Sequence, residues 1–116
     1  MDAPHHVLIV EDEMMLAMMV EDVLSAEGYS VTTAASHAAA LAAIDKCDMD
    51  VAVLDINLGS HSALPLADEL VNRGVPVVFA SGYGATGLPD RFRGCTVLQK
   101  PYLPSELVSC VSALLA

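Results

Sequence analysis

Hydrophobic and polar positions follow two different periods along the chain, and the change from one to the other marks the predicted elements. Continuous apolar runs rich in β-branched residues are typical of strands that are buried on both faces. Such runs lie at Val7–Val10, Tyr29–Ala34, Val51–Leu54, Val75–Ala80 and Thr96–Gln99. The pattern therefore predicts five strands.

Between these runs, apolar residues recur every three or four positions, as they do on one face of a helix. Ser36 is placed to cap the second of these helices, and Gly28 and Gly74 are placed to end the first and the third. A loop containing Gly59 precedes the third helix. The predicted helices span about Asp12–Glu27, Ser36–Lys46, Ala63–Asn72 and Pro104 to the last residues.

The segment Gly82–Gly94 departs from both periods. It contains four glycines and Pro89, so we expect only a short helix there and the most mobile part of the molecule. Elsewhere strands and helices alternate, which predicts parallel βαβ units with right-handed crossovers and helices on both faces of the sheet. We expect one α/β domain over residues 1–116.

Composition and charge limit the function classes. A chain of 116 residues has room for one ordinary domain, and 54% hydrophobic with 17% charged residues argues against disorder. Fifteen acidic residues against five Lys and Arg give a formal charge of -10. Such a chain repels phosphate backbones and anionic lipids, so we expect neither DNA binding by this chain nor membrane association.

The three cysteines, Cys47, Cys95 and Cys110, show no C-x-x-C spacing. This pattern favours reduced thiols over a disulfide framework or a zinc site. The first residues lack the cationic and apolar segments of a signal peptide, and no run approaches the length that spans a bilayer. We therefore expect a cytoplasmic protein.

Polar residues gather where the predicted strands end. Glu11-Asp12-Glu13 follows the first strand, Asp55 the third, Ser81 the fourth and Lys100-Pro101 the fifth. Each alone has an ordinary explanation, such as a charge at a helix N-terminus or a turn residue. Together they point to one site, because ligands of a doubly wound sheet bind at the carboxyl ends of its strands.

The chemistry of these residues indicates phosphoryl transfer. Clustered carboxylates repel one another and need a cation, and Mg²⁺ suits carboxylate oxygens and phosphate. A carboxylate beside such an ion is a plausible nucleophile toward phosphorus. The Lys100 ammonium and the Ser81 hydroxyl would stabilise the charge on the transferred group. We interpret Asp55 as a phosphoryl acceptor.

Four motifs resemble the receiver domain of two-component response regulators. They are Val-Leu-Ile-Val-Glu-Asp-Glu at 7–13, Val-Leu-Asp-Ile-Asn-Leu at 53–58, Ala-Ser-Gly at 80–82 and Gln-Lys-Pro-Tyr at 99–102. The resemblance covers essentially the whole chain. It implies a flavodoxin-like, doubly wound (βα)5 three-layer sandwich with strand order 2-1-3-4-5. It also implies a histidine kinase or phosphotransfer protein as partner.

The resemblance also implies roles for individual residues. Asp55 matches the phosphorylated aspartate, and Asp12 with Glu11 matches the acidic pair that holds Mg²⁺, with Asp12 the more direct ligand. Asn57 matches the position whose backbone carbonyl completes the metal site. Lys100 matches the family's lysine, and the Lys100-Pro101 bond is usually cis in that family.

Ser81 matches the switch hydroxyl that follows the phosphoryl group. Many receivers carry an aromatic residue three positions before the lysine, but this chain has Val97 there. The stretch 77–84 is instead similar to the FAT GUY subgroup of receivers, which places an aromatic residue, here Tyr83, after strand four. We predict that phosphorylation orders Gly82–Gly94 and that Tyr83 repacks, which changes the affinity for a partner.

Two alternative functions are compatible with the fold expected from the sequence. The first is a receiver fold that binds a partner independently of phosphorylation, and the complete set Asp12, Asp55, Ser81 and Lys100 argues against it. The second is a Mg²⁺-dependent phosphohydrolase. The second is disfavoured because Asn57 stands where that class places a general acid. His61 is a weak candidate for contact with the phosphoryl group. The methionines at 14, 15, 18 and 19 recur at helical spacing, which favours core and flanking positions over a soft-metal or adaptable binding surface. We expect a partner or weak homodimer surface on the apolar exposed part of the first or last helix.

Overall fold

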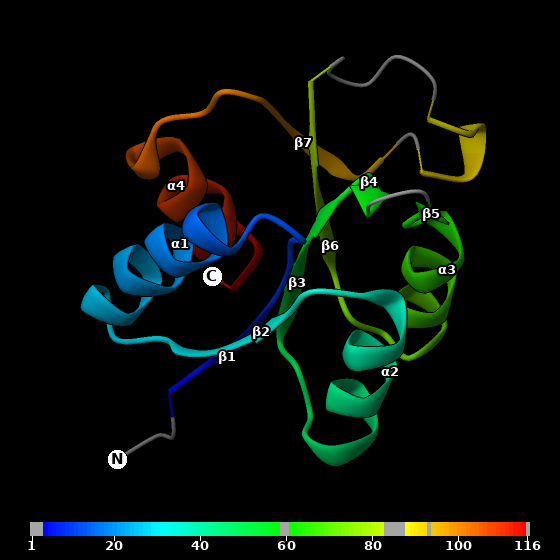
Figure 1. Ribbon diagram of the computed structural model, residues 1–116, viewed down its shortest axis with the longest axis horizontal. Helices are drawn as coiled ribbons and strands as arrows, with labels where there is room; N and C mark the ends of the chain where they lie inside the picture. The colour runs from blue at the N-terminus through cyan, green and yellow to red at the C-terminus, as the bar shows by residue number, and fades with distance from the viewer. Residues whose placement is uncertain (1–3, 59–60, 83–87, 93, 116) are drawn as a thin grey trace.

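A computed structural model describes residues 4–58, 61–82, 88–92 and 94–115. In these residues a five-stranded parallel sheet has the order β2-β1-β3-β6-β7, and four α-helices cover it (Figure 1). This order corresponds to 2-1-3-4-5 and confirms the predicted flavodoxin-like fold. The bounds are β1 His6–Val10, α1 Met14–Ala26, β2 Ser30–Ala34, α2 His37–Lys46, β3 Val51–Asp55, α3 Leu64–Asn72, β6 Val77–Ser81, β7 Thr96–Gln99 and α4 Pro104–Leu115.

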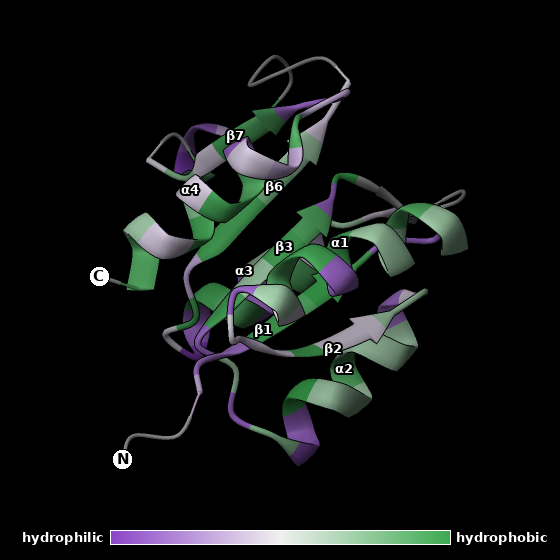
Figure 2. Cartoon of the chain, turned by 90° about the vertical axis from the view of Figure 1, so that its left-hand side faces the viewer, coloured by the Kyte–Doolittle hydropathy of each residue, from purple (hydrophilic) through white to green (hydrophobic). Residues whose placement is uncertain are grey.

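The helices form two outer layers around the sheet. α1 and α4 lie on one face, and α2 and α3 lie on the other (Figure 1). The three central strands are almost entirely buried and apolar, as the hydropathy colouring of Figure 2 shows. Alternate strand residues point to opposite faces, so each strand supplies both halves of the core. The α2–α3 half contains Leu54, Leu66, Leu70 and Phe79, and the α1–α4 half contains Val20, Leu24, Leu107 and Val111.

Local sequence signals fix three of the helix ends. The Ser36 hydroxyl accepts a hydrogen bond from the Ala39 amide at 3.1 Å, which confirms the predicted cap of α2. Gly28 and Gly74 follow α1 and α3 with φ of 94° and 79°, a conformation that glycine adopts without strain. α1 begins at Met14 rather than near Asp12, because Glu13 is its N-cap.

Two short strands lie outside the predicted set. β4 (Asn57–Leu58) and β5 (His61–Ser62) pair antiparallel in the loop expected around Gly59. One turn of 3₁₀ helix, η1, spans Asp90–Phe92 within the segment predicted to hold only a short helix. Residues 83–87 and 93 are outside the described residues, so the expected mobility of Gly82–Gly94 stays a prediction.

Candidate functional site at the carboxyl end of the sheet

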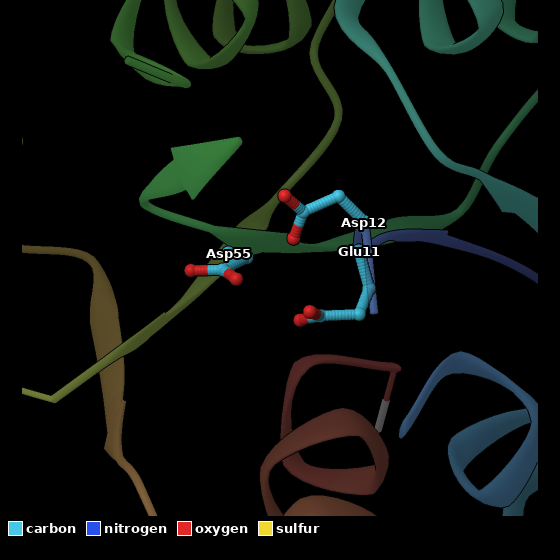
Figure 3. Close-up of side chains that lie close together, drawn as sticks. All are labelled: Glu11, Asp12 and Asp55. Carbon is cyan, nitrogen blue, oxygen red and sulfur yellow. The ribbon is translucent and has the colours of Figure 1, made fainter. Parts of the chain in front are cut away.

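Three carboxylates meet where the strand order reverses. β1 and β3 are neighbours in the sheet, but the helices that follow them, α1 and α3, lie on opposite faces. This arrangement opens a crevice at the carboxyl ends of the two strands. Glu11 and Asp12 follow β1, and Asp55 is the last residue of β3. One oxygen from each of these side chains lies within 4.8 Å of the others, and Figure 3 shows all three carboxylates directed into the same space.

Lys100 enters the same space from β7. Its Nζ donates hydrogen bonds to Oδ2 of Asp55 at 2.9 Å and to Oε2 of Glu11 at 3.3 Å. Its backbone N–H donates to the carbonyl of Ser81 at 2.8 Å, so the end of β6 is tied to the same lysine. The Lys100-Pro101 bond is cis, as the resemblance implied. Glu11 and Lys100, which are 89 positions apart in the sequence, thus share one site.

The two acidic residues after β1 have different surroundings. The Glu11 side chain is only 5% exposed, and its other oxygen, Oε1, accepts a hydrogen bond from the Glu13 amide at 3.1 Å. Its own amide donates to the carbonyl of Ala34 in β2. Asp12 is exposed at the rim of the crevice. Glu11 is therefore held in place by the protein, whereas Asp12 is exposed to solvent.

The charges in the site are unbalanced. Burial raises the pKa of Glu11, and the neighbouring charge of Asp55 adds to this, against the hydrogen bonds from Glu13 and Lys100. Burial by itself would lower the pKa of Lys100, but its hydrogen bond and charge interaction with Asp55, together with Glu11, outweigh burial and raise that pKa. The ammonium therefore stays protonated, and one positive charge faces three carboxyl groups.

This set of side chains fits a hard divalent cation. The donors are all carboxylate oxygens, which are the ligands that Mg²⁺ prefers, and the local charge is negative even with Lys100 present. Asp12 follows β1 and Asp55 ends β3, and both would hold the ion. The arrangement matches the acidic metal site predicted from the sequence.

The remaining predicted residues take different places. Ser81 is buried at the end of β6, next to β3 and β7, and Asn57 begins β4 two residues after Asp55. Val97 is half-buried in β7. His61 begins β5, but its side chain is outside the described set, and so is the whole of Tyr83. The roles given to Tyr83 and His61 therefore stay predictions.

Sequence reasoning missed the groups that hold Glu11. The amide of Glu13 and the carbonyl of Ala34 are backbone groups, so the residue types do not predict their hydrogen bonds with Glu11. The bond from Lys100 to Glu11 was missed as well, although both residues were expected at the site. Only the three-dimensional structure, which brings the ends of β1, β2 and β7 to one edge of the sheet, reveals these contacts.

A groove runs beside the site, between the start of α1 and the chain after β7. It has a volume of about 340 Å³ and is lined by Glu13, Leu16, Lys100, Pro101 and Tyr102. Large apolar side chains stand exposed on the same two segments: Met14, Met15 and Met18 on α1 and Leu103 before α4. No helix in the described part of the chain is long and apolar enough to cross a membrane.

The chain is similar to proteins of one known family. Residues 7–112 match the family described as the response regulator receiver domain. The transcriptional regulatory protein TcrX of Mycobacterium tuberculosis is 37% identical over 119 residues, which cover 97% of this chain and 50% of TcrX. The solution structure of SdrG from Sphingomonas melonis Fr1 is 39% identical with a TM-score of 0.81, and covers 100% of both chains. The BeF3-activated conformation of SdrG from Pseudomonas melonis Fr1 is 38% identical with a TM-score of 0.82, again over 100% of both chains.

The chain belongs to the response regulator receiver family of two-component systems. Members of this family are phosphorylated on an aspartate with Mg²⁺, interact with histidine kinases or phosphotransfer proteins and are not enzymes in the ordinary sense. The chain spans about half the length of the curated relatives it matches. TcrX is named as a transcriptional regulatory protein, and the relatives named here give no support to the phosphohydrolase reading or the phosphorylation-independent reading.

Proposed function

We propose that Asp55 of this receiver accepts a phosphoryl group from a phosphohistidine of a kinase or phosphotransfer protein. The observation that carries this proposal is the position of Lys100. Its ammonium bridges Asp55 and Glu11 at 2.9 and 3.3 Å, while Asp12 completes a group of three carboxylates around the acceptor. Among the described carboxylates, this group alone combines burial, a cation partner and further acidic neighbours.

The reaction needs little covalent help from the protein. A carboxylate oxygen of Asp55 attacks phosphorus, a phosphorus–oxygen bond forms and the phosphorus–nitrogen bond to the donor histidine breaks. The electron pair returns to the imidazole nitrogen, which takes up a proton from water. Hydrolysis later adds water to the acyl phosphate and releases inorganic phosphate, so the chain itself promotes both its phosphorylation and its return to the resting state.

The residues of the site then have distinct tasks. Asp12 and Asp55, with Glu11 behind them and the backbone carbonyl of Asn57, would hold Mg²⁺. When bound, this ion neutralises the phosphoryl oxygens and lets an anionic donor approach the acidic site. Lys100 holds Asp55 in orientation and places a second positive charge beside the transferred group.

Ser81 couples the acceptor to the rest of the domain. Its side chain is buried at the end of β6, which pairs with β3 up to Asp55. In this proposal, the hydroxyl hydrogen-bonds a phosphoryl oxygen. The structural likeness to the BeF3-activated form of SdrG supports a receiver with two conformations. We propose that the affinity for a partner changes through the segment that follows, Gly82–Gly94 with Tyr83, and that the protein works in the cytoplasm.

Intact-protein mass spectrometry after incubation with acetyl phosphate and Mg²⁺ tests this function. We expect a gain of one phosphoryl group in the wild type, and no gain in Asp55→Asn or in EDTA. Asp50→Asn is the matched control, because Asp50 precedes β3 at the other end of the sheet and its variant retains the gain. If Asp55→Asn gains the group as readily as the wild type, Asp55 is not the acceptor.

The phosphodonor docks, in this proposal, on the groove beside Lys100 and the exposed methionines of α1. Met14 and Met15 are 76% and 85% exposed, and an apolar surface of this size beside an acceptor site is typical of a protein interface. Met15→Glu should slow phosphorylation by a purified phosphotransfer protein about tenfold or more, yet leave labelling by acetyl phosphate unchanged. Equal slowing with both donors would show that the variant damages the site instead.

A further inference from the structure

The two phenylalanines of the chain are in contact with each other. Phe79 lies in the middle of β6 and Phe92 is the last residue of η1, and their ring centroids are 5.3 Å apart with an angle of 69° between the planes. This edge-to-face geometry is favourable for aromatic pairs. Both rings are buried, at 0% and 2% exposure. The turn after β6 is thus fastened to the sheet by one aromatic contact inside the core.

The same turn is fastened to α3 at the surface. Arg91 donates to both oxygens of Asp68, from Nε to Oδ1 at 2.8 Å and from the second nitrogen to Oδ2 at 3.0 Å. The guanidinium also lies 4.7 Å from the centroid of the Phe92 ring. The hydrogen bond from Arg91 lowers the pKa of Asp68, in keeping with a formed pair. We call these contacts, Phe79–Phe92 and Arg91–Asp68, the turn latch.

The inner half of the turn latch touches the element that carries the switch hydroxyl. Side chains two positions apart on a strand point to the same face, so Phe79 and Ser81 lie on one side of β6. Phe79 also pairs with Leu54, the residue before Asp55 in β3. A displacement of Ser81 toward a phosphoryl group on Asp55 therefore changes the packing space of the Phe79 ring.

Phe92 takes up core space beside the position where many receivers have a strand-five aromatic residue. Val97 is next to Phe79 across the β6–β7 pair, and both Val97 and Phe92 belong to the α2–α3 half of the core. A valine there has no ring that could turn inward or outward. The nearest ring to Phe79 on this face, among the described residues, is that of Phe92.

We propose that the turn latch is the switch of this receiver: it holds the unphosphorylated state, and phosphorylation of Asp55 opens it. The proposal rests on the proposed function, since it specifies how the same site is read. Close-packed interiors change between discrete arrangements rather than deform gradually, so a shift of Ser81 repacks Phe79 against a new neighbour. Phe92 then leaves its contact, and the short turn that carries it pulls Arg91 away from Asp68.

Linkage gives the first test. A contact made only in the resting state weakens the binding of the phosphoryl mimic beryllofluoride by the factor by which it favours the resting state. Removal of the contact must therefore tighten this binding by that factor. We expect Arg91→Gln and Asp68→Asn each to bind beryllofluoride with Mg²⁺ about two- to fivefold more tightly. The double variant should gain no more than either single one, because both remove the same ion pair.

Arg73→Gln is the matched control for this series. Arg73 also makes a surface ion pair with α3, to Glu69 at 2.9 Å, and it reaches Asp45 of α2 at 2.8 Å. It lies at the opposite end of the sheet from Asp55 and outside the turn latch. Its variant should therefore bind beryllofluoride as the wild type does. An equal gain in Arg73→Gln would show that any loosening of α3 tightens binding, and the proposal would be wrong.

Fluorine NMR gives the second test. Labelling with fluorophenylalanine yields two resonances, which Phe92→Leu assigns, and each ring lies in the ring-current field of the other. We expect both resonances to move when the wild type binds beryllofluoride. We also expect the Phe92 resonance of free Arg91→Gln to move part of the way in the same direction. A Phe92 resonance that stays in place while that of Phe79 moves would overturn the proposal.

The two tests separate this inference from the function on which it rests. If acetyl phosphate labels Asp55 but the Phe92 resonance and the beryllofluoride affinities stay unchanged, the receiver function stands and the turn latch is wrong. If neither labelling nor beryllofluoride binding occurs, the proposed function fails and the turn latch fails with it.

Discussion

Charged groups occur at both ends of the sheet, but their surroundings differ. At the amino end, Asp50 accepts a hydrogen bond from the His6 amide at 2.7 Å and lies 3.7 Å from Nδ1 of His5. The side chains of His5 and Asp50 are about half exposed, at 53% and 46%. At the carboxyl end, the side chains of Glu11 and Asp55 are 5% and 11% exposed and share the single ammonium of Lys100.

This difference separates charges that fasten the fold from charges that serve a ligand. Exposed pairs are well solvated and contribute about 0–1 kcal/mol, so their presence needs no further explanation. Buried carboxylates in excess of their cations oppose folding, and folds retain them where something else binds. The unbalanced charge at the carboxyl end is therefore the physical mark of function, whereas the paired charge at the amino end is structural.

The largest expected effect comes from removal of the one cation at the carboxyl end. Lys100→Met removes the ammonium that donates to both Asp55 and Glu11, and loss of the cation from a largely buried ion pair leaves negative charge that it no longer balances. We expect the free energy of unfolding in EDTA to fall by about 2–3 kcal/mol, measured by urea denaturation. Lys46→Met, at the exposed end of α2, is the control and should change it by about 0.5 kcal/mol or less.

A smaller effect should follow from metal binding. Mg²⁺ at ten times its Kd should add about 1.4 kcal/mol to the free energy of unfolding, because only the folded chain assembles the three carboxylates. Asp12→Asn should lose most of this increment. Asp50→Asn should keep it, because Asp50 lies at the other end of the sheet, beside the His6 amide. Equal increments in all three proteins would contradict a metal site at the carboxyl end.

The smallest effect concerns pH and the exposed pair of the turn latch. The hydrogen bond from Arg91 lowers the pKa of Asp68 below its ordinary value of 3.8, so the folded state favours the ionised form. The resulting stabilisation is present above the unfolded-state pKa and is lost as the pH falls through the folded-state pKa. Denaturation curves of the wild type and Asp68→Asn should therefore differ at pH 6 and converge near pH 2. A difference that persists at the lowest pH would show that Asp68 acts by something other than its charge.

Much of the fold follows from local pattern. The apolar run Val7–Val10 and the five-residue β3 could be placed from sequence because strands buried on both faces are apolar throughout. Ser36 and Gly74 could be placed because capping and positive φ need particular residues. The β4–β5 pair could not, since two-residue strands carry no periodic signal. β6 begins at Val77 rather than Val75, because Pro76 has no N–H for the ladder, although its carbonyl accepts from Ala52.

The members of the site could be predicted, but their contacts could not. Parallel strands bring their carboxyl ends together, so Asp12, Asp55 and Lys100 follow from topology alone. Which carboxylate is buried depends on distant backbone groups, such as the Ala34 carbonyl that fixes Glu11. The turn latch is also non-local, since Asp68 and Arg91 are 23 residues apart. Residue types and spacing do not encode such pairings.

The ion pairs of α3 also decide which part of the molecule stays still. Arg73, at the end of this helix, holds both the Ile44 carbonyl and the Asp45 carboxylate of α2, so α2 and α3 form one braced unit. Loss of the Arg91–Asp68 ion pair leaves these contacts of Arg73 with α2 in place. In this proposal, α3 keeps its position and the Asp90–Phe92 turn moves relative to it. A partner that binds the activated state would then contact the Asp68 carboxylate, which Arg91 no longer covers, on a helix that has not moved. Activation would thus create a binding surface by removing a covering side chain and not by moving the surface itself.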